Sequence, residues 1–148
     1  MQGKIKSKVM LARRNNLAPW SSLIYVMCQE FEEDLNHLLL NCQFAWKVWC
    51  VVIKWWGLVW VTPESLREHA IWWWSLKFRK LEKQLWESLF ISILWHIWKA
   101  RNETAFYNNE VRWWEVLEEA KFYVAVWLKA GKSSLPLSVS ISCIHWKR

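Results

Sequence analysis

Three residues with metal-ligating side chains, Cys28, His37 and Cys42, are spaced as ligands of one ion. Thiolate sulfur and imidazole nitrogen are ligands that zinc prefers, and a structural zinc site closes with four of them around the ion. The spacing C-x2-C-x8-H-x4-C requires a cysteine at position 25, where this chain has Tyr25. The sequence therefore predicts a zinc-knuckle-like loop that offers three of the four ligands.

Two interpretations of these three residues stay open. In the first, three ligands and a water hold zinc, an arrangement known mainly from catalytic sites that their surroundings keep rigid. In the second, Cys28 and Cys42 are buried thiols and His37 caps or packs against a helix. The missing ligand favours the second interpretation slightly. Cys50 lies eight residues after Cys42, roughly 12 Å along a helix and too far to help. The Tyr25 phenolate would need its high pKa lowered.

Short helical elements should position the three residues. The candidate metal loop spans residues 24–36, after a basic helix or extended arm over residues 4–18. Asp34 can cap the start of a short helix over 35–41, with Asn41 as the next cap. Apolar residues then recur at helical spacing over 43–56, and Gly57 should end that helix.

The rest of the chain predicts three further helices. Thr62 followed by Pro63 is typical of a helix start, which predicts a helix from there to about residue 78. The longest helix should span 81–106 and form the centre of the body, and the last should span 110–130 and stop at Gly131. His69 and His96 are expected to be satisfied helical histidines. The central helix carries a polar stripe of Ser88, Ser92, His96 and Lys99.

These elements predict an all-α fold, a small helical domain with an N-terminal zinc-knuckle-like loop and a long central helix. We divide the chain into a basic arm (1–23), a helical domain (24–130) and a tail (131–148). The first 29 residues contain no acid, so the arm could contact phosphate backbones, although a solvated, frayed end fits equally well. Its five candidate nucleic-acid-binding residues are Lys4, Lys6, Lys8, Arg13 and Arg14.

Several function classes are disfavoured by composition. The basic N-terminus lacks the apolar stretch of a secretory signal, and no apolar run reaches the roughly 18 residues of a membrane span. We therefore expect an intracellular protein, nuclear or cytoplasmic, whose cysteines are thiols or ligands rather than disulfides. Asp34 is the sole aspartate, and no carboxylate cluster is available to hold the Mg²⁺ ions of a polymerase or nuclease. We expect no enzymatic activity.

Three stretches together carry a resemblance to a known family. They are residues 11–15 (LARRN) leading to Pro19-Trp20, residues 33–42 (EDLNHLLLNC) followed by 45–49 (AWKVW), and residues 97–102 (IWKARN) ending at Phe106. With the Cys/His spacing, the chain resembles the zinc-binding reverse-transcriptase domain of plant LINE-type retrotransposons and their ribonuclease H relatives. The resemblance covers about residues 4–130.

The resemblance implies a function and a set of partners. It implies zinc as the cofactor, with Cys28, His37 and Cys42 as second to fourth ligands and Tyr25 in place of the first, a change of one base in a cysteine codon. It also implies RNA or DNA as a partner, beside the polymerase and ribonuclease H domains of a parent polyprotein, and no membrane. We expect a non-catalytic, partly degenerate zinc-binding and nucleic-acid-binding module, a fragment of a decayed element.

A second function class stays open because the chain contains sixteen tryptophans. Successive helical residues point about 100° apart, so Trp72, Trp73 and Trp74 cannot all face one core. The alternative is a structural helical scaffold that docks a protein partner through exposed tryptophans, without a metal.

Overall fold

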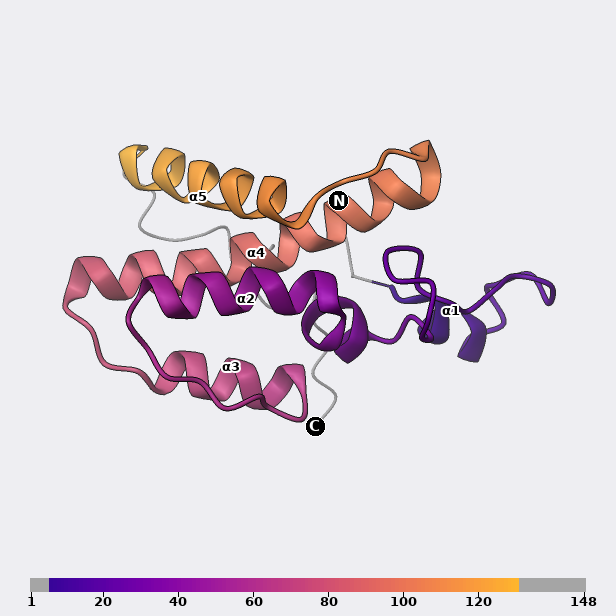
Figure 1. The fold of residues 1–148 in the computed structure, drawn as a ribbon, viewed down its shortest axis with the longest axis horizontal. Helices are drawn as coiled ribbons and strands as arrows, with labels where there is room; N and C mark the ends of the chain where they lie inside the picture. Colours follow the sequence, from indigo (N-terminus) through magenta and orange to yellow (C-terminus); the bar gives the residue numbers. More distant parts are fainter. Residues whose placement is uncertain (1–5, 131–148) are drawn as a thin grey trace.

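The structure is a computed structural model that describes residues 6–130, and over these residues the fold is all-α. In chain order the elements are α1 (Lys8–Arg13), the π-helical turn η1 (His37–Asn41), α2 (Gln43–Trp55), α3 (Leu66–Ser75), α4 (Lys80–Tyr107) and α5 (Trp113–Lys129). The long helix α4 runs through the middle of the molecule, with α5 and α3 on opposite sides, while α1 and the candidate metal loop lie at one end (Figure 1). None of the described helices is long and apolar enough to cross a membrane.

The bounds of α2, α4 and α5 agree with those predicted from the sequence to within about three residues. Gly57 ends α2 as expected, in the left-handed conformation that glycine adopts without strain, with φ of 69°. Asn108 ends α4 in the same region of backbone space, with φ of 55°. The tail after residue 130 and Lys4 lie outside the described residues.

The predicted start of α3 at Thr62-Pro63 is wrong. The helix begins at Leu66 with Ser65 as its cap, whose hydroxyl accepts a hydrogen bond from the Glu68 amide at 3.2 Å. The Leu66 amide donates to Asn36 Oδ1 at 2.9 Å. These contacts satisfy backbone donors of the first turn, and one of them comes from a residue 30 positions away that no local pattern reveals. The helix ends at Ser75 rather than near residue 78.

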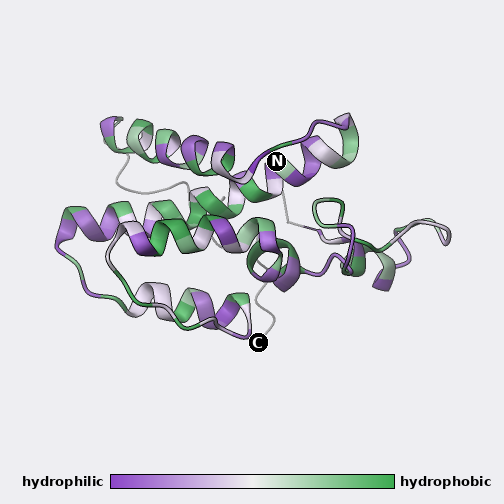
Figure 2. Ribbon diagram, viewed as in Figure 1, coloured by the Kyte–Doolittle hydropathy of each residue, from purple (hydrophilic) through white to green (hydrophobic). Residues whose placement is uncertain are grey.

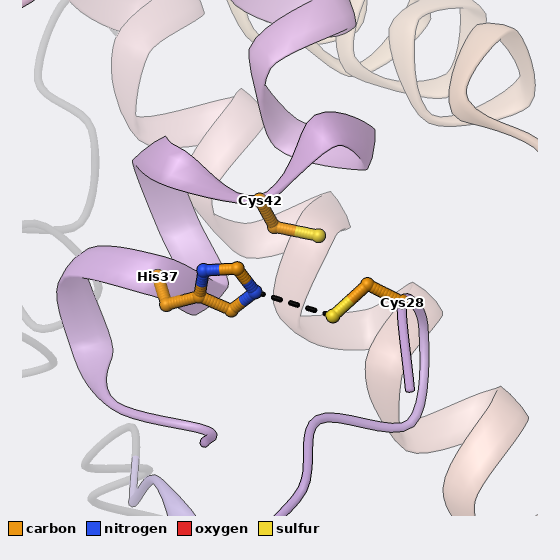
Figure 3. Close-up of side chains that lie close together, drawn as sticks. All are labelled: Cys28, His37 and Cys42. Atoms are coloured by element: carbon orange, nitrogen blue, oxygen red, sulfur yellow. Dashed lines mark hydrogen bonds between the residues drawn. The ribbon is translucent and has the colours of Figure 1, made fainter. Parts of the chain in front are cut away.

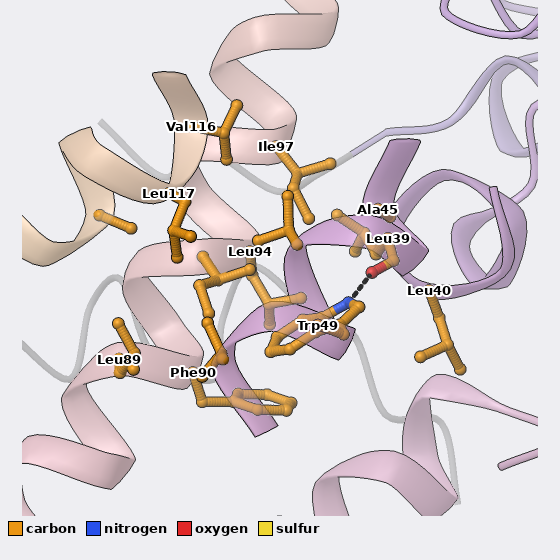
Figure 4. Packing of buried hydrophobic residues seen from close by; sticks show 14 of the residues in the cluster. Leu39, Leu40, Ala45, Trp49, Leu89, Phe90, Leu94, Ile97, Val116 and Leu117 are labelled. Atoms are coloured by element: carbon orange, nitrogen blue, oxygen red, sulfur yellow. Dashed lines mark hydrogen bonds between the residues drawn. The ribbon is translucent and has the colours of Figure 1, made fainter. Parts of the chain in front are cut away.

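Tryptophans fill the centre of the core. The rings of Trp73 and Trp86 stack with centroids 3.6 Å apart, and each indole N–H donates to the other residue's carbonyl oxygen at 2.9 Å. Trp49 donates to the Leu39 carbonyl at 2.8 Å, which joins η1 to α2 (Figure 4). Buried indoles need such partners for their N–H groups. Hydrophobic residues are most frequent in the middle of α2 and α4 (Figure 2).

The three consecutive tryptophans of α3 point in different directions, as helical geometry requires. Trp73 is completely buried, Trp72 is half-buried and Trp74 is exposed. Trp20, which precedes the candidate metal loop, is 87% exposed. The adjacent tryptophans therefore do not share one environment.

The polar stripe predicted on α4 is partly covered by a second helix. Ser92 and His96 are buried, since α5 packs over them. The Ser92 hydroxyl donates to the Ala120 carbonyl at 3.0 Å, and His96 Nδ1 donates to the Ser92 carbonyl at 2.7 Å. The Ser92 hydroxyl and His96 Nδ1 thus have partners inside the helix pair, which offsets the cost of burying them, whereas His96 Nε2 has no hydrogen-bond partner among the described residues.

Candidate metal centre

The three residues predicted as ligands converge in the structure. The ligand atoms of Cys28, His37 and Cys42 all lie within 4.8 Å of one another, and Cys28 Sγ is 3.3 Å from His37 Nε2 (Figure 3). Zinc–sulfur bonds of about 2.3 Å and zinc–nitrogen bonds of about 2.0 Å place tetrahedral ligands about 3.5–3.8 Å apart. The Cys28–His37 separation is close to these values and the other two are at most 4.8 Å, so the group could hold a metal ion. Within residues 6–130 it is the only such group of His, Cys, Asp or Glu side chains.

A closed turn carries Cys28. The Gln29 amide donates to the Tyr25 carbonyl at 2.8 Å, and Gln29 has a left-handed backbone with φ of 57°. An antiparallel bridge closes the loop, because the Tyr25 amide donates to Phe31 and the Glu33 amide donates to Leu23, each at 2.8 Å. A left-handed backbone is uncommon for a residue other than glycine. The bridge holds the turn in this shape, and Cys28 points at His37.

A π-helical turn brings His37 and Cys42 together. Residues five apart in an α-helix point about 140° away from each other. Here the Cys42 amide donates to the His37 carbonyl at 2.8 Å, an i+5 hydrogen bond that widens the turn and places both side chains on one side. The predicted cap at Asp34 is confirmed, since its carboxylate accepts from the His37 amide at 2.9 Å. The predicted cap at Asn41 is wrong, because Cys42 takes the position before α2.

Tyr25 fills the space beside the three ligands. Its side chain is fully buried, and its ring meets the His37 imidazole edge-on with centroids 5.7 Å apart. Burial raises the pKa of the phenol well above its usual value, and the nearby Cys42 and Glu33 raise it further. The hydroxyl has no hydrogen-bond partner among the described residues. Tyr25 is therefore a neutral phenol at the position where the spacing requires a fourth ligand.

Burial favours the neutral forms of the Cys42 thiol and the His37 imidazole. Burial raises the pKa of the Cys42 thiol to about 11, and burial lowers the pKa of His37. A neutral imidazole is ready to ligate, whereas the thiol must lose its proton when a metal binds. Cys50 lies outside the group, half-buried on α2, as its distance along the chain implied.

The basic residues of the arm have different environments. Lys6, Arg13 and Arg14 are exposed. The Lys8 ammonium donates to the Ile24 carbonyl at 2.6 Å, so this side chain is attached to the loop. Lys4 lies outside the described residues. The exposed positive charge of the described arm therefore comes from three side chains.

Two residues that sequence reasoning missed lie near Tyr25, which is itself beside the group. Glu33 and Arg101 form a buried ion pair with contacts of 2.7 and 3.0 Å. They are 68 residues apart, so no local spacing in the sequence predicts the pair. One signal was available, namely that Arg101 follows Leu94 and Ile97 at helical spacing, on the apolar side of the central helix, where a buried arginine needs a counter-charge.

Comparisons with protein families, with curated proteins and with solved structures found no match for this chain. The geometry of the cysteines and histidine is thus the basis for a functional assignment.

Proposed function

We propose that this protein is a non-catalytic, partly degenerate zinc-binding module that contacts nucleic acid, derived from a retrotransposon reverse transcriptase. The single observation that carries the proposal is the convergence of Cys28, His37 and Cys42. Two thiolates and an imidazole suit zinc, and soft thiolates disfavour magnesium and calcium. The retrotransposon origin rests on the resemblance of the three sequence stretches.

Zinc in this group would have a structural role. The loop contributes Cys28, and η1 with the residue after it contributes His37 and Cys42, so a bound ion would link two segments. Glu30, Glu32 and Asp34 are exposed on the loop. These acids favour a cation and repel phosphates, so contact with nucleic acid falls to the arm rather than to the loop.

Metal titration of the full chain tests the zinc site. We expect the wild-type chain to bind one equivalent of cobalt(II), used as a spectroscopic probe, with a thiolate charge-transfer band that zinc abolishes. Loss of a residue that orients a metal ligand weakens binding by roughly 10–100-fold, and Cys42→Ser, which removes a ligand itself, should weaken binding by more than that. Cys50→Ser is the matched control, because it makes the same change on α2 outside the group. No band in wild type, or equal affinity in wild type and Cys42→Ser, would reject the site.

The arm predicts a salt-dependent affinity for single-stranded RNA. Replacing its five basic residues with glutamine should flatten the slope of log K against log salt by about 0.7 for each phosphate that the arm no longer neutralises. Fluorescence anisotropy with a labelled mixed-sequence oligonucleotide measures this slope. A slope that does not change would remove the arm from the mechanism. The matched control neutralises five exposed basic residues of the helical body, Lys47, Lys54, Arg67, Lys77 and Lys80.

The alternative function, a scaffold that docks a partner through exposed tryptophans, finds less support. The exposed tryptophans of the described region lie one each on the segment after α1 and on α2, α3, α4 and α5, as Trp20, Trp55, Trp74, Trp95 and Trp114. No helix in residues 6–130 therefore presents a face with two exposed tryptophans.

A further inference from the structure

A buried ion pair joins the metal loop to the central helix. Glu33 is completely buried and Arg101 is 5% exposed. Arg101 Nη2 donates to Glu33 Oε1 at 2.7 Å and Arg101 Nε donates to Oε2 at 3.0 Å. This two-bond geometry is the strongest form of an arginine–carboxylate pair.

Further contacts satisfy both charged groups. Glu33 Oε1 also accepts from the Lys8 amide at 3.0 Å, and the Glu33 carbonyl accepts from the Val9 amide at 3.2 Å. Arg101 Nη1 donates to Asn102 Oδ1 at 2.9 Å, and the guanidinium lies over the rings of Trp98 and Phe106, at 5.1 and 5.7 Å from their centroids. A buried pair repays its desolvation only when its remaining hydrogen-bonding groups are satisfied in this way. Glu33 thus connects α1, the loop and α4.

Along the chain, Glu33 lies between the two segments that carry the metal-ligating residues. Cys28 belongs to the loop, whose bridge ends at the Glu33 amide bonded to Leu23. His37 and Cys42 belong to η1 and the residue after it, and η1 packs on both α2 and α4. Arg101 is part of α4, so its bond to Glu33 holds the loop on the same helix that supports η1.

We propose that the Glu33–Arg101 pair, rather than a metal ion, holds the loop on the helical body, so that Cys28, His37 and Cys42 are assembled before any metal binds. Many small zinc modules are unfolded without their metal, because ion binding supplies their folding free energy. Here the contacts of the pair supply the attachment, and Glu33 and Arg101 are positioning residues. The inference rests on the proposed function only in treating the three residues as ligands.

Hydrogen exchange on the full chain in EDTA tests the attachment without metal. The Tyr25 and Glu33 amides, which donate across the loop, should be protected in wild type and exchange at least about tenfold faster in Arg101→Met. The α5 amides should keep their protection. Lys99→Met is the matched control, since it removes a surface ion pair with Glu119 from the same helix. Unprotected loop amides in wild type, or equal rates in Arg101→Met and the control, would overturn the proposal.

Cobalt titration of the same variants gives the second measurement. Arg101→Met keeps all three ligands, yet its cobalt affinity should fall roughly 10–100-fold, whereas Lys99→Met should bind like wild type. If the amides of Arg101→Met exchange rapidly in every helix, the variant is unfolded, and Glu33→Gln is used in its place for both measurements. Glu33→Gln keeps the side-chain volume and an oxygen that can accept from the Lys8 amide. If wild type binds no cobalt, the metal function is rejected, but the hydrogen-exchange rates still test whether the ion pair attaches the loop. Wild type and Arg101→Met that bind cobalt equally reject the positioning role and leave the metal function standing.

Discussion

Tyr25→Cys is expected to bind zinc at least about 100-fold more tightly than the wild-type chain. Loss of a residue that only orients a metal ligand already weakens metal binding by about 10–100-fold, and gain of a ligand itself should have a larger effect. In the structure the side chain at position 25 lies beside the three predicted ligands. The Tyr25 side chain is fully buried with its ring edge-on to His37, and the Tyr25 carbonyl closes the turn that carries Cys28. We therefore expect a cysteine at position 25 to act as the fourth ligand.

The same substitution should destabilise the metal-free chain. Removing a fully buried ring costs on the order of 2–5 kcal/mol, because apolar surface is no longer buried and a cavity remains. The absence of the hydroxyl offsets part of this cost, because in wild type it is buried without a hydrogen-bond partner among the described residues. Zinc at 100 times its dissociation constant restores about 2.7 kcal/mol. We therefore expect Tyr25→Cys to be less stable than wild type in EDTA and to gain far more from zinc.

Tyr25→Ser separates the ligand from the cavity. Serine leaves nearly the same space as cysteine but is a poor zinc ligand, so this variant should show the loss in EDTA without the gain in zinc. Competition with a chromophoric chelator gives the affinities, and urea unfolding with and without zinc gives the stabilities. Equal zinc affinity in Tyr25→Cys and Tyr25→Ser would mean that position 25 does not face the metal.

The candidate site was predictable from the sequence where its information is local. The spacing of Cys28, His37 and Cys42 identified the group that the structure brings together, and Asp34 was correctly identified as a cap. The π-helical turn was not predictable, because an i+5 hydrogen bond leaves no mark in residue types. The attachment of the loop was also hidden, since the Glu33–Arg101 pair depends on which helix packs against the loop.

The fold shows the same division between local and distant information. Apolar periodicity and Gly57 located α2, α4 and α5, because each helix buries one face and the glycine ends the first of them. The start of α3 was misplaced because Asn36, far away in sequence, satisfies the Leu66 amide. The burial of Ser92 and His96 within the polar stripe of α4 was not predictable, because helical periodicity is the same for a polar surface and for polar contacts with a second helix.

His69 contradicts the expectation of a satisfied helical histidine. It is fully buried among aromatic rings, with the Trp49 centroid 4.6 Å away, and neither ring nitrogen has a hydrogen-bond partner among the described residues. Burial lowers its pKa to about 3, against about 6.5 in an unfolded chain. The unfolded state therefore binds a proton over a pH range in which the folded state does not.

This difference makes the fold sensitive to acid with a defined sign. The contribution of neutral His69 is complete above about pH 6.5 and is lost as the pH falls toward 3, at about 1.36 kcal/mol per pH unit. Two units below 6.5, at pH 4.5, the loss is about 2.7 kcal/mol.

His69→Phe keeps a ring in the aromatic cluster and removes the titration. Urea unfolding in EDTA at pH 7 and pH 4.5 should show wild type losing about 2.7 kcal/mol more than His69→Phe, because all other ionisable residues are the same in the two chains. Equal losses in the two chains would show that His69 is protonated in the folded state, and that its ring reaches water or a partner.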